Sequence, residues 1–223
     1  MNQRIIKRTA EAIQPKTSCA DSGMDIIILG LDIHGIELAG RIATVDKYRM
    51  LGFAAHGDDK PETFGGYPVF SATEAFECFP HAMHLPLHVW KREHEFGKER
   101  WTTFTDPLAV ISPGAQIGRG CIVFPHCFIG ANARLDDGVF MLAGAVVNHD
   151  CHIGERTTIT TNVSLAGGVK IGGGAYIGQA ATIRQNLCVG IKSLVGMGSV
   201  VVKDVPDGTT VMGNPAKPRI ANF

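Results

Sequence analysis

The chain has 223 residues, 45% of them hydrophobic, and its formal net charge is zero at pH 7. This length and apolar content suffice for one or two domains with their own cores. The balanced charge argues against nucleic acid or an anionic membrane surface as the main partner, and no apolar run is long enough to span a bilayer. Because the first residues also lack the apolar segment of a secretory signal, we expect a cytoplasmic protein.

The first predicted elements form a βαβ unit, the building block of a small Rossmann-like domain with a parallel sheet. Residues 25–29 are an apolar run that ends at Gly30, which is typical of a buried parallel strand. An amphipathic helix follows, in which Glu37 and Arg41 are spaced to form an ion pair, and a second strand is predicted at 50–54. The dinucleotide fingerprint G-x-G-x-x-G is absent, although the N-terminus of this helix is a candidate phosphate site.

Residues 71–100 carry weaker signals of secondary structure. Residues 71–74, Ser-Ala-Thr-Glu, form a capping box that predicts a short helix ending near residue 78. The histidines of 81–90 are interpreted as ordinary surface or core residues on a strand and loop, since no Asp, Glu or Cys is in register with them. A further helix is predicted at 91–100.

From residue 111 to residue 201, an aliphatic residue or Met recurs at every sixth position without a break. These positions are Ile111, Ile117, Val123, Ile129, Leu135, Met141, Val147, Ile153, Ile159, Leu165, Ile171, Ile177, Ile183, Val189, Val195 and Val201. Small residues recur two positions earlier, and glycines follow many of the aliphatic residues, as short strands joined by tight turns require. A period of six predicts a hexapeptide parallel β-helix; a Gly-rich β-sandwich would not hold one frame for so long.

The six cysteines include no C-x-x-C pair, so neither a zinc ribbon nor a redox motif is indicated. Cys121, Cys127 and Cys151 occupy the small interior position of the repeat, and we predict that they are core residues. Cys151 lies close to a histidine in sequence, but its phase turns the thiol inward, away from any substrate.

Two motifs stand out against the repeats: Asn-His-Asp-Cys-His-Ile-Gly at 148–154 and Gly-Asn-Pro-Ala-Lys-Pro-Arg at 213–219. With the unbroken hexads and the N-terminal βαβ unit, they resemble the left-handed β-helix family that includes sialic-acid O-acetyltransferases and bacillosamine-pathway N-acetyltransferases of nucleotide-linked amino sugars. The resemblance implies a left-handed coil, a homotrimer with active sites between subunits, and acetyl-CoA as the co-substrate, with no metal required.

The chain is therefore predicted to have four parts. They are an N-terminal extension at 1–24, a small Rossmann-like acceptor-binding domain at 25–105, a left-handed β-helix acetyltransferase domain at 106–204 and a C-terminal cap or tail at 205–223.

The predicted chemistry needs a base for the attacking group and a donor for the oxyanion, because acetyl-CoA is already activated. His149 follows Val147 by two residues, at a predicted corner where its side chain projects outward, and Asp150 beside it can accept a hydrogen bond from the ring. The resemblance implies that His149 is the catalytic base, that Asp150 tunes it, and that Gly167 on the next coil donates its N–H to the oxyanion. For His152 we expect no direct role, and for His126, on a different corner, a structural one.

The resemblance also implies which residues bind acetyl-CoA. The candidates are Thr158, Gly167, Gln179, Arg184, Gly196, Met197 and Lys203. Arg184 and Lys203 have the charge to pair with its phosphates, and solvated surface positions explain them equally well.

For the acceptor, the candidates are Gly30, Ile33, His34 and Gly35. His34 and Gly35 match the end of the family's Gly-Ala-Ser-Gly-His-Gly turn, but the preceding Leu-Asp-Ile departs from it, and Asp32 would face a phosphate unfavourably. The family's acidic residues after the second strand are replaced by Ala54 and Ala55, and its later Ile-Gly-Asn-like turn by His-Leu-Pro-Leu-His.

We therefore predict an acetyl-CoA-dependent N-acetyltransferase that acts on the amino group of a nucleotide-linked amino sugar, in a surface-glycan pathway. An O-acetyltransferase of a sugar hydroxyl is the near alternative, because the same base serves both. A β-helix zinc carbonic anhydrase needs three convergent histidines, and the spacing of His126, His149 and His152 does not favour it. A non-catalytic scaffold is disfavoured by the intact Asn-His-Asp motif.

Overall fold

The computed structural model describes residues 23–55, 60–87 and 98–219. Most of the predicted N-terminal extension, part of the loop after the second strand and most of the helix predicted at 91–100 lie outside these ranges. Within the described residues, no helix has the length and apolar content that a bilayer crossing requires.

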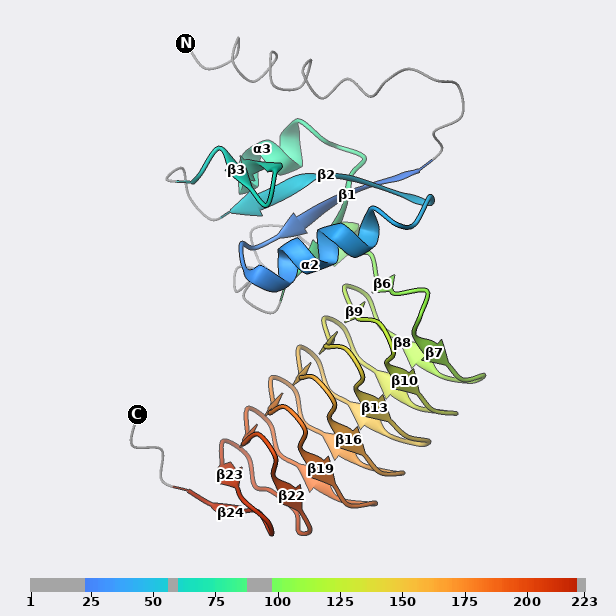
Figure 1. The fold of residues 1–223 in the computed structure, drawn as a ribbon, viewed down its shortest axis with the longest axis vertical. Helices are drawn as coiled ribbons and strands as arrows, with labels where there is room; N and C mark the ends of the chain where they lie inside the picture. Colours follow the sequence, from blue (N-terminus) through green and yellow to red (C-terminus); the bar gives the residue numbers. More distant parts are fainter. Residues whose placement is uncertain (1–22, 56–59, 88–97, 220–223) are drawn as a thin grey trace.

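The N-terminal part is a sheet with the strand order β3-β4-β2-β1-β5, in which β1 lies parallel to both β2 and β5 (Figure 1). Its elements are β1 Met24–Leu29, α2 Ile33–Ile42, β2 Tyr48–Ala55, β3 Thr63–Phe64, β4 Tyr67–Ser71, α3 Ala72–Glu77, β5 Met83–Pro86 and the 3₁₀ turn η1 Lys98–Arg100. The predicted βαβ unit and parallel sheet are confirmed. The capping box that opens α3 is also confirmed, with Ser71 and Glu74 bonded to each other's backbone N–H groups.

The two faces of this sheet follow the alternation of side chains along β1. Ile26 and Ile28 pack in a cluster with α2, whereas Ile27 and Leu29 pack in a separate cluster with α3. Figure 1 shows that α2 lies between the sheet and the second part of the molecule, so the first cluster is also the joint between the two parts.

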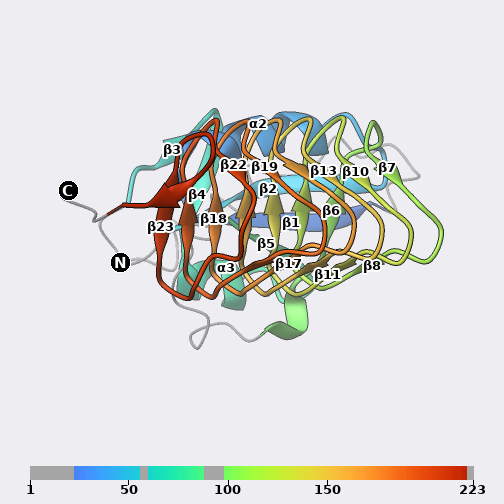
Figure 2. The same ribbon diagram turned by 90° about the horizontal axis from the view of Figure 1, so that it is seen from below.

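The second part is a parallel β-solenoid, as the six-residue period predicts (Figures 1 and 2). From β6 to β22, successive strands fall in turn on three sheets, and each strand pairs in register with the strand eighteen residues away, as Phe128 does with Val146. Three hexads thus make one coil. The chain ends this array with an antiparallel pair of short strands, β23 and β24.

Each sheet of the solenoid collects every third strand. The six-stranded sheet contains β7 Val110–Ile111, β10 Phe128–Ile129, β13 Val146–Val147, β16 Ser164–Leu165, β19 Thr182–Ile183 and β22 Val200–Val201. The five-stranded solenoid sheet contains β8 Gln116–Ile117, β11 Arg134–Leu135, β14 His152–Ile153, β17 Lys170–Ile171 and β20 Cys188–Val189. The eight-stranded sheet contains β6 Phe104–Thr105, β9 Ile122–Val123, β12 Phe140–Met141, β15 Thr158–Ile159, β18 Tyr176–Ile177, β21 Leu194–Val195, β23 Thr210–Met212 and β24 Lys217–Pro218.

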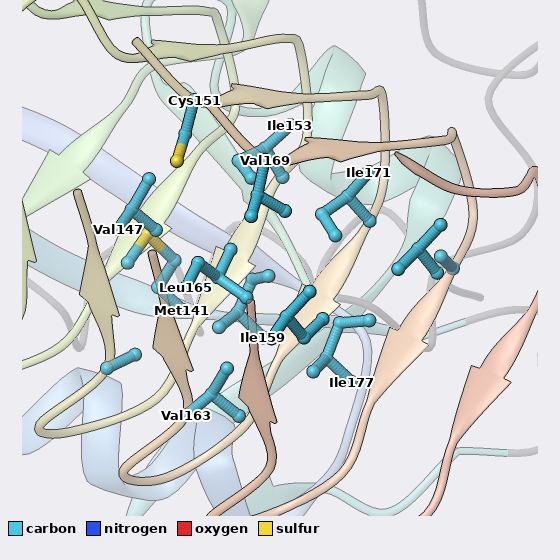
Figure 3. Packing of buried hydrophobic residues seen from close by; sticks show 14 of the residues in the cluster. Met141, Val147, Cys151, Ile153, Ile159, Val163, Leu165, Val169, Ile171 and Ile177 are labelled. Carbon is cyan, nitrogen blue, oxygen red and sulfur yellow. The ribbon is translucent and has the colours of Figure 1, made fainter. Parts of the chain in front are cut away.

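The aliphatic series of the hexads fills the interior of the coils, and Figure 3 shows these side chains pointing toward one another across the coil. Cys121, Cys127 and Cys151 are buried among them, as predicted, and each thiol donates to a carbonyl oxygen at 3.2 Å. Burial raises the pKa of Cys121 to about 12 and that of Cys127 to about 11, and it also raises the pKa of Cys151. A thiol so placed is a core residue and not a nucleophile.

The joint between the two parts combines apolar packing with one ion pair. Phe104 and Phe140 of the first coils belong to the same cluster as α2 and the N-terminal sheet. The Arg41 guanidinium donates to both carboxylate oxygens of the buried Asp106, at 2.6 and 3.0 Å. The predicted pairing of Arg41 with Glu37 is therefore wrong. The guanidinium pairs instead with a fully buried carboxylate 65 positions away, because an unpaired charge costs more free energy when it is buried than when it is exposed.

Candidate functional site

The Asn-His-Asp motif forms a corner of the solenoid, between β13 of the six-stranded sheet and β14 of the five-stranded solenoid sheet. Asp150 has a left-handed backbone, with φ of 59°, a conformation that Asp and Asn adopt more readily than most residues. Its N–H donates to the carbonyl of Ala131 on the preceding coil, at 2.9 Å, which fixes the corner in the stack. The His149 side chain projects from this corner and is 67% exposed.

His149 and Asp150 form a hydrogen-bonded pair, with 2.8 Å between Nδ1 and Oδ2. The hydrogen bonds from His149 and from Asn132 hold the pKa of the Asp150 carboxyl below its usual range, so this group is ionised at neutral pH. An ionised carboxylate only accepts hydrogen bonds, and Nδ1 must therefore carry the proton. In the neutral ring Nε2 then keeps the lone pair that a general base requires.

Gly167, on the next coil, lies directly against this ring. A Cβ at residue 167 would stand 2.5 Å from Cε1 and 2.6 Å from Nε2 of His149, so a side chain there is incompatible with the position of the ring. Among the described residues, no group accepts a hydrogen bond from the Gly167 N–H. The structure thus brings three of the predicted residues, His149, Asp150 and Gly167, to one corner.

The other histidines of the solenoid lie elsewhere. His152 is exposed on the five-stranded solenoid sheet, with Nε2 2.8 Å from Asp136 Oδ2. Burial opposes ionisation of Asp136, but its bonds to His152 and Arg134 outweigh this and lower its pKa. His126 occupies an exposed left-handed corner, with φ of 61°. No group of three His, Cys, Asp or Glu side chains among the described residues is arranged to hold a metal ion.

The predicted acetyl-CoA residues fall on two edges of the coil. Arg184 and Lys203 are exposed and follow β19 and β22, on the same edge as His149 and Gly167. Gln179 and Met197 are exposed on the other edge of the six-stranded sheet, one coil apart, where the N–H of Gly198 donates to the carbonyl of Gln179. One chain alone does not bring the two groups together.

Two further candidates for acetyl-CoA binding have little free surface. Thr158, on β15, is buried with 8% exposure, between Phe140 and Tyr176 of the neighbouring strands. Gly196 is half-buried, and a Cβ there would stand 2.8 Å from the Cβ of Met212. Their predicted contacts with the co-substrate therefore depend on backbone or on a small exposed fraction of the side chain.

The predicted acceptor residues surround the start of α2. Gly30 has φ of 105°, and Ile33 is 63% exposed. Nδ1 of His34 is 3.0 Å from Glu37, and its ring lies 5.9 Å from that of Phe140, at the joint with the solenoid. A Cβ at Gly35 would meet Leu87 and Phe53 at 3.0 Å, so this glycine serves close packing of α2 on the sheet.

Asp32 accounts for the departure from the family's glycine turn. Its carboxylate is the N-cap of α2 and accepts from the N–H groups of His34, at 2.6 Å, and Gly35, at 3.3 Å. These are the amides that a phosphate at the helix N-terminus would use. The chain supplies its own anion at the phosphate site that the sequence suggests.

Asn132 was not among the predicted site residues, yet its side-chain amide lies against Asp150, with Nδ2 3.2 Å from Oδ1. The signal was available in the sequence, since residues eighteen positions apart stack on neighbouring coils and 132 is the position stacked below 150.

No protein-family model and no curated protein matches the chain. Among solved structures, the acetyltransferase domain of PglB from Neisseria gonorrhoeae is 30% identical, with a TM-score of 0.80 over 88% of this chain and 100% of that domain. The same domain in complex with acetyl coenzyme A is 29% identical, with a TM-score of 0.79 and the same coverage.

PerB from Caulobacter crescentus, in complex with CoA and GDP-perosamine, is 26% identical, with a TM-score of 0.76 over 91% of this chain and all of that one. A variant of perosamine N-acetyltransferase from the same organism, with the same ligands, is 25% identical, with a TM-score of 0.78 over 92% and 100% of the two chains. The likeness covers both the N-terminal sheet and the solenoid, and the chain belongs to the hexapeptide-repeat family of left-handed β-helix sugar acetyltransferases.

Proposed function

We propose that this protein transfers the acetyl group of acetyl-CoA to the amino group of a nucleotide-linked amino sugar. The observation that carries the proposal is the corner at which the His149–Asp150 pair faces a glycine that leaves room for the ring. Relatives with this fold bind acetyl coenzyme A, or CoA together with GDP-perosamine, which supports the choice of donor and of acceptor class.

The reaction needs one base and one oxyanion donor. Nε2 of His149 removes a proton as the acceptor nitrogen attacks the thioester carbon, while Asp150 stabilises the imidazolium that forms. The N–H of Gly167 donates to the oxyanion of the tetrahedral intermediate. When the C–S bond breaks, the CoA thiolate leaves and the imidazolium returns the proton to it, so that the products are the acetamide and free CoA.

We also propose that the active unit is a homotrimer with its sites between subunits. The two groups of predicted acetyl-CoA residues border opposite edges of the six-stranded sheet, so a second copy packed on that sheet would bring one edge near the other. The outer face of the sheet is suited to such packing, because Val110 is 58% exposed and Phe128, Val146 and Val200 are only half-buried in the single chain.

The acceptor is proposed to bind where α2 meets the solenoid, so residues 25–105 act as the acceptor-binding domain. His34 lies at that joint, where it contacts the rings of Phe124 and Phe140 on the first coils, and Ile33 beside it in sequence is exposed. Because Asp32 occupies the first turn of α2, the diphosphate of the acceptor is expected to lie away from that helix end.

The test is release of CoA thiol from acetyl-CoA with UDP-, GDP- and dTDP-linked amino sugars, each compared with the sugar that carries a hydroxyl in place of the amine. Turnover with an amino sugar and none with its hydroxyl partner supports the proposal and identifies the nucleotide. Turnover with the hydroxyl sugars would replace N-acetylation by O-acetylation. CoA binding without turnover on any nucleotide sugar would contradict the proposed acceptor class.

A further inference from the structure

The corner that carries Asp150 belongs to a column of corners stacked eighteen residues apart. Asn132, one coil before, has φ of 57°, and Asn186, two coils after, has φ of 58°. A Cβ at Gly114, one coil before Asn132, would stand 3.0 Å from the amide oxygen of Asn132. The oxygen of this amide thus lies toward the preceding coil, and its NH₂ group lies toward the next coil, where Asp150 stands.

Asn132 completes a chain of three polar side chains across two coils. Its Nδ2 donates to Oδ1 of Asp150 at 3.2 Å, and Oδ2 of the same carboxylate accepts from Nδ1 of His149 at 2.8 Å. Each carboxylate oxygen therefore has one partner, on opposite sides of the group. We propose that Asn132 is a positioning residue, which holds the Asp150 carboxylate in the orientation that aims His149 at the acceptor.

The reason lies in the exposure of the pair. The side chains of His149 and Asp150 are 67% and 57% exposed, so packing does little to restrict their rotation. A carboxylate held through one oxygen is free to turn about its own bond, and the imidazole would turn with it. The second hydrogen bond, from Asn132, removes this freedom, and because it is donated to the ionised form it also favours the charge that His149 needs.

The left-handed turn alone does not explain an asparagine here. Gly, Asn and Asp all accept this backbone, and glycine occupies the equivalent position at Gly114 and Gly168. Asn162 has the same conformation on another edge of the coil, with φ of 56°, but the residue stacked on it is Ala180, which offers no side-chain acceptor. Asn162 is therefore a matched control, because it shares the left-handed turn of Asn132 and has no stacked carboxylate to which its side chain could donate.

The experiment compares Asn132→Gly and Asn132→Asp with Asn162→Gly and Asn162→Asp in the acetyl-transfer assay. It rests on the proposed role of His149, which His149→Ala tests separately. Loss of one hydrogen bond in Asn132→Gly is expected to lower kcat roughly three- to tenfold, with the KM for acetyl-CoA unchanged. The Asn162 variants are expected to keep wild-type kcat.

The pH profile separates positioning from a structural role. Among the described residues, Asp150 is the charged group against the His149 ring, and Gly167 contributes only backbone. A second carboxylate in Asn132→Asp favours the imidazolium, so the acid limb of kcat/KM should move a few tenths of a pH unit upward at low salt. If His149→Ala abolishes turnover while both Asn132 variants keep the wild-type kcat and acid limb, Asn132 has no positioning role. If His149→Ala stays active, the proposed base is wrong instead.

Discussion

Gly167→Ala tests where the ring of His149 must lie for catalysis. The new Cβ would stand 2.5 Å from Cε1 and 2.6 Å from Nε2, whereas ordinary contact begins near 3.4 Å, so the ring must retreat by about 0.9 Å. The backbone of Gly167 is not left-handed, so alanine brings no strain of its own there. Because His149 is exposed, its ring can rotate away at little cost in folding free energy.

The expected result is a loss of activity without a loss of stability. A displacement of about 1 Å at a reacting group can cost on the order of 10²-fold in rate, and we expect turnover to fall by about 10- to 100-fold. Tm should stay within about 2 °C of wild type, as for a neutral surface substitution. Thiol release and a thermal melt followed by circular dichroism measure the two quantities.

Gly173→Ala is the control for this prediction. Gly173 lies at the same position one hexad later, and its added Cβ would meet no ring but the backbone of Glu155, with the carbonyl oxygen at 3.2 Å and the nitrogen at 3.7 Å. Its turnover should stay near that of wild type. Wild-type turnover in Gly167→Ala itself would show that the ring position seen here is not the catalytic one, and a Tm lowered by more than about 5 °C would show that the clash is not confined to His149.

Three further predictions concern single side chains. His149→Ala should lower kcat by about 10²–10⁴, the range for loss of a general base, with the assembly unchanged by light scattering; activity within threefold of wild type would contradict the mechanism. His84 is buried, and neither ring nitrogen has a hydrogen-bond partner among the described residues; burial and Arg100 lower its pKa to about 4. Its neutral form is favoured on folding, so about 3 kcal/mol of stability should be lost as the pH falls from 6.5 to 4, and His84→Leu should remove this part of the dependence in denaturant titrations. Arg41→Met removes the ion-pair partner of the buried Asp106 and should lower the free energy of unfolding several times more than Arg49→Met does at the half-buried pair with Asp25, in the same titrations; equal costs would refute the role given to the joint.

The solenoid was predictable from sequence because all its coils are equivalent. Each interior position has equivalent neighbours, so Val147 and Leu165 both have to be apolar. The period of six residues repeats this requirement along the chain, which makes the pattern easy to recognise. The same phase placed Cys151 inward and His149 outward, as the structure has them. The corners of the solenoid could be located from the sequence for the same reason.

The contacts that sequence analysis missed are those that do not follow from the six-residue period. The partner of Arg41 is 65 residues away, in another part of the fold, and only the docking of α2 on the first coil selects Asp106 over Glu37. Asp32 looked like a poor neighbour for a phosphate, but its role as a helix cap depends on where α2 begins. These choices are made by burial and by local backbone geometry, which a single sequence specifies only weakly.

The stacking of the coils also gives the molecule a scale of length. Each coil advances the chain by one strand spacing, about 4.8 Å, and the N-terminal sheet is fixed to the first coils through Arg41 and the cluster around Phe104. Along the axis of the solenoid, the separation between the first coils and the His149 corner is therefore set in steps of one coil. Insertion of one further eighteen-residue coil between them would lengthen the reach from one end of the acceptor to the other by about 4.8 Å, and would leave every local contact at both ends in place. In this solenoid the number of coils between the N-terminal sheet and the His149 corner thus sets how far apart the two lie along the axis, independently of the contacts within each.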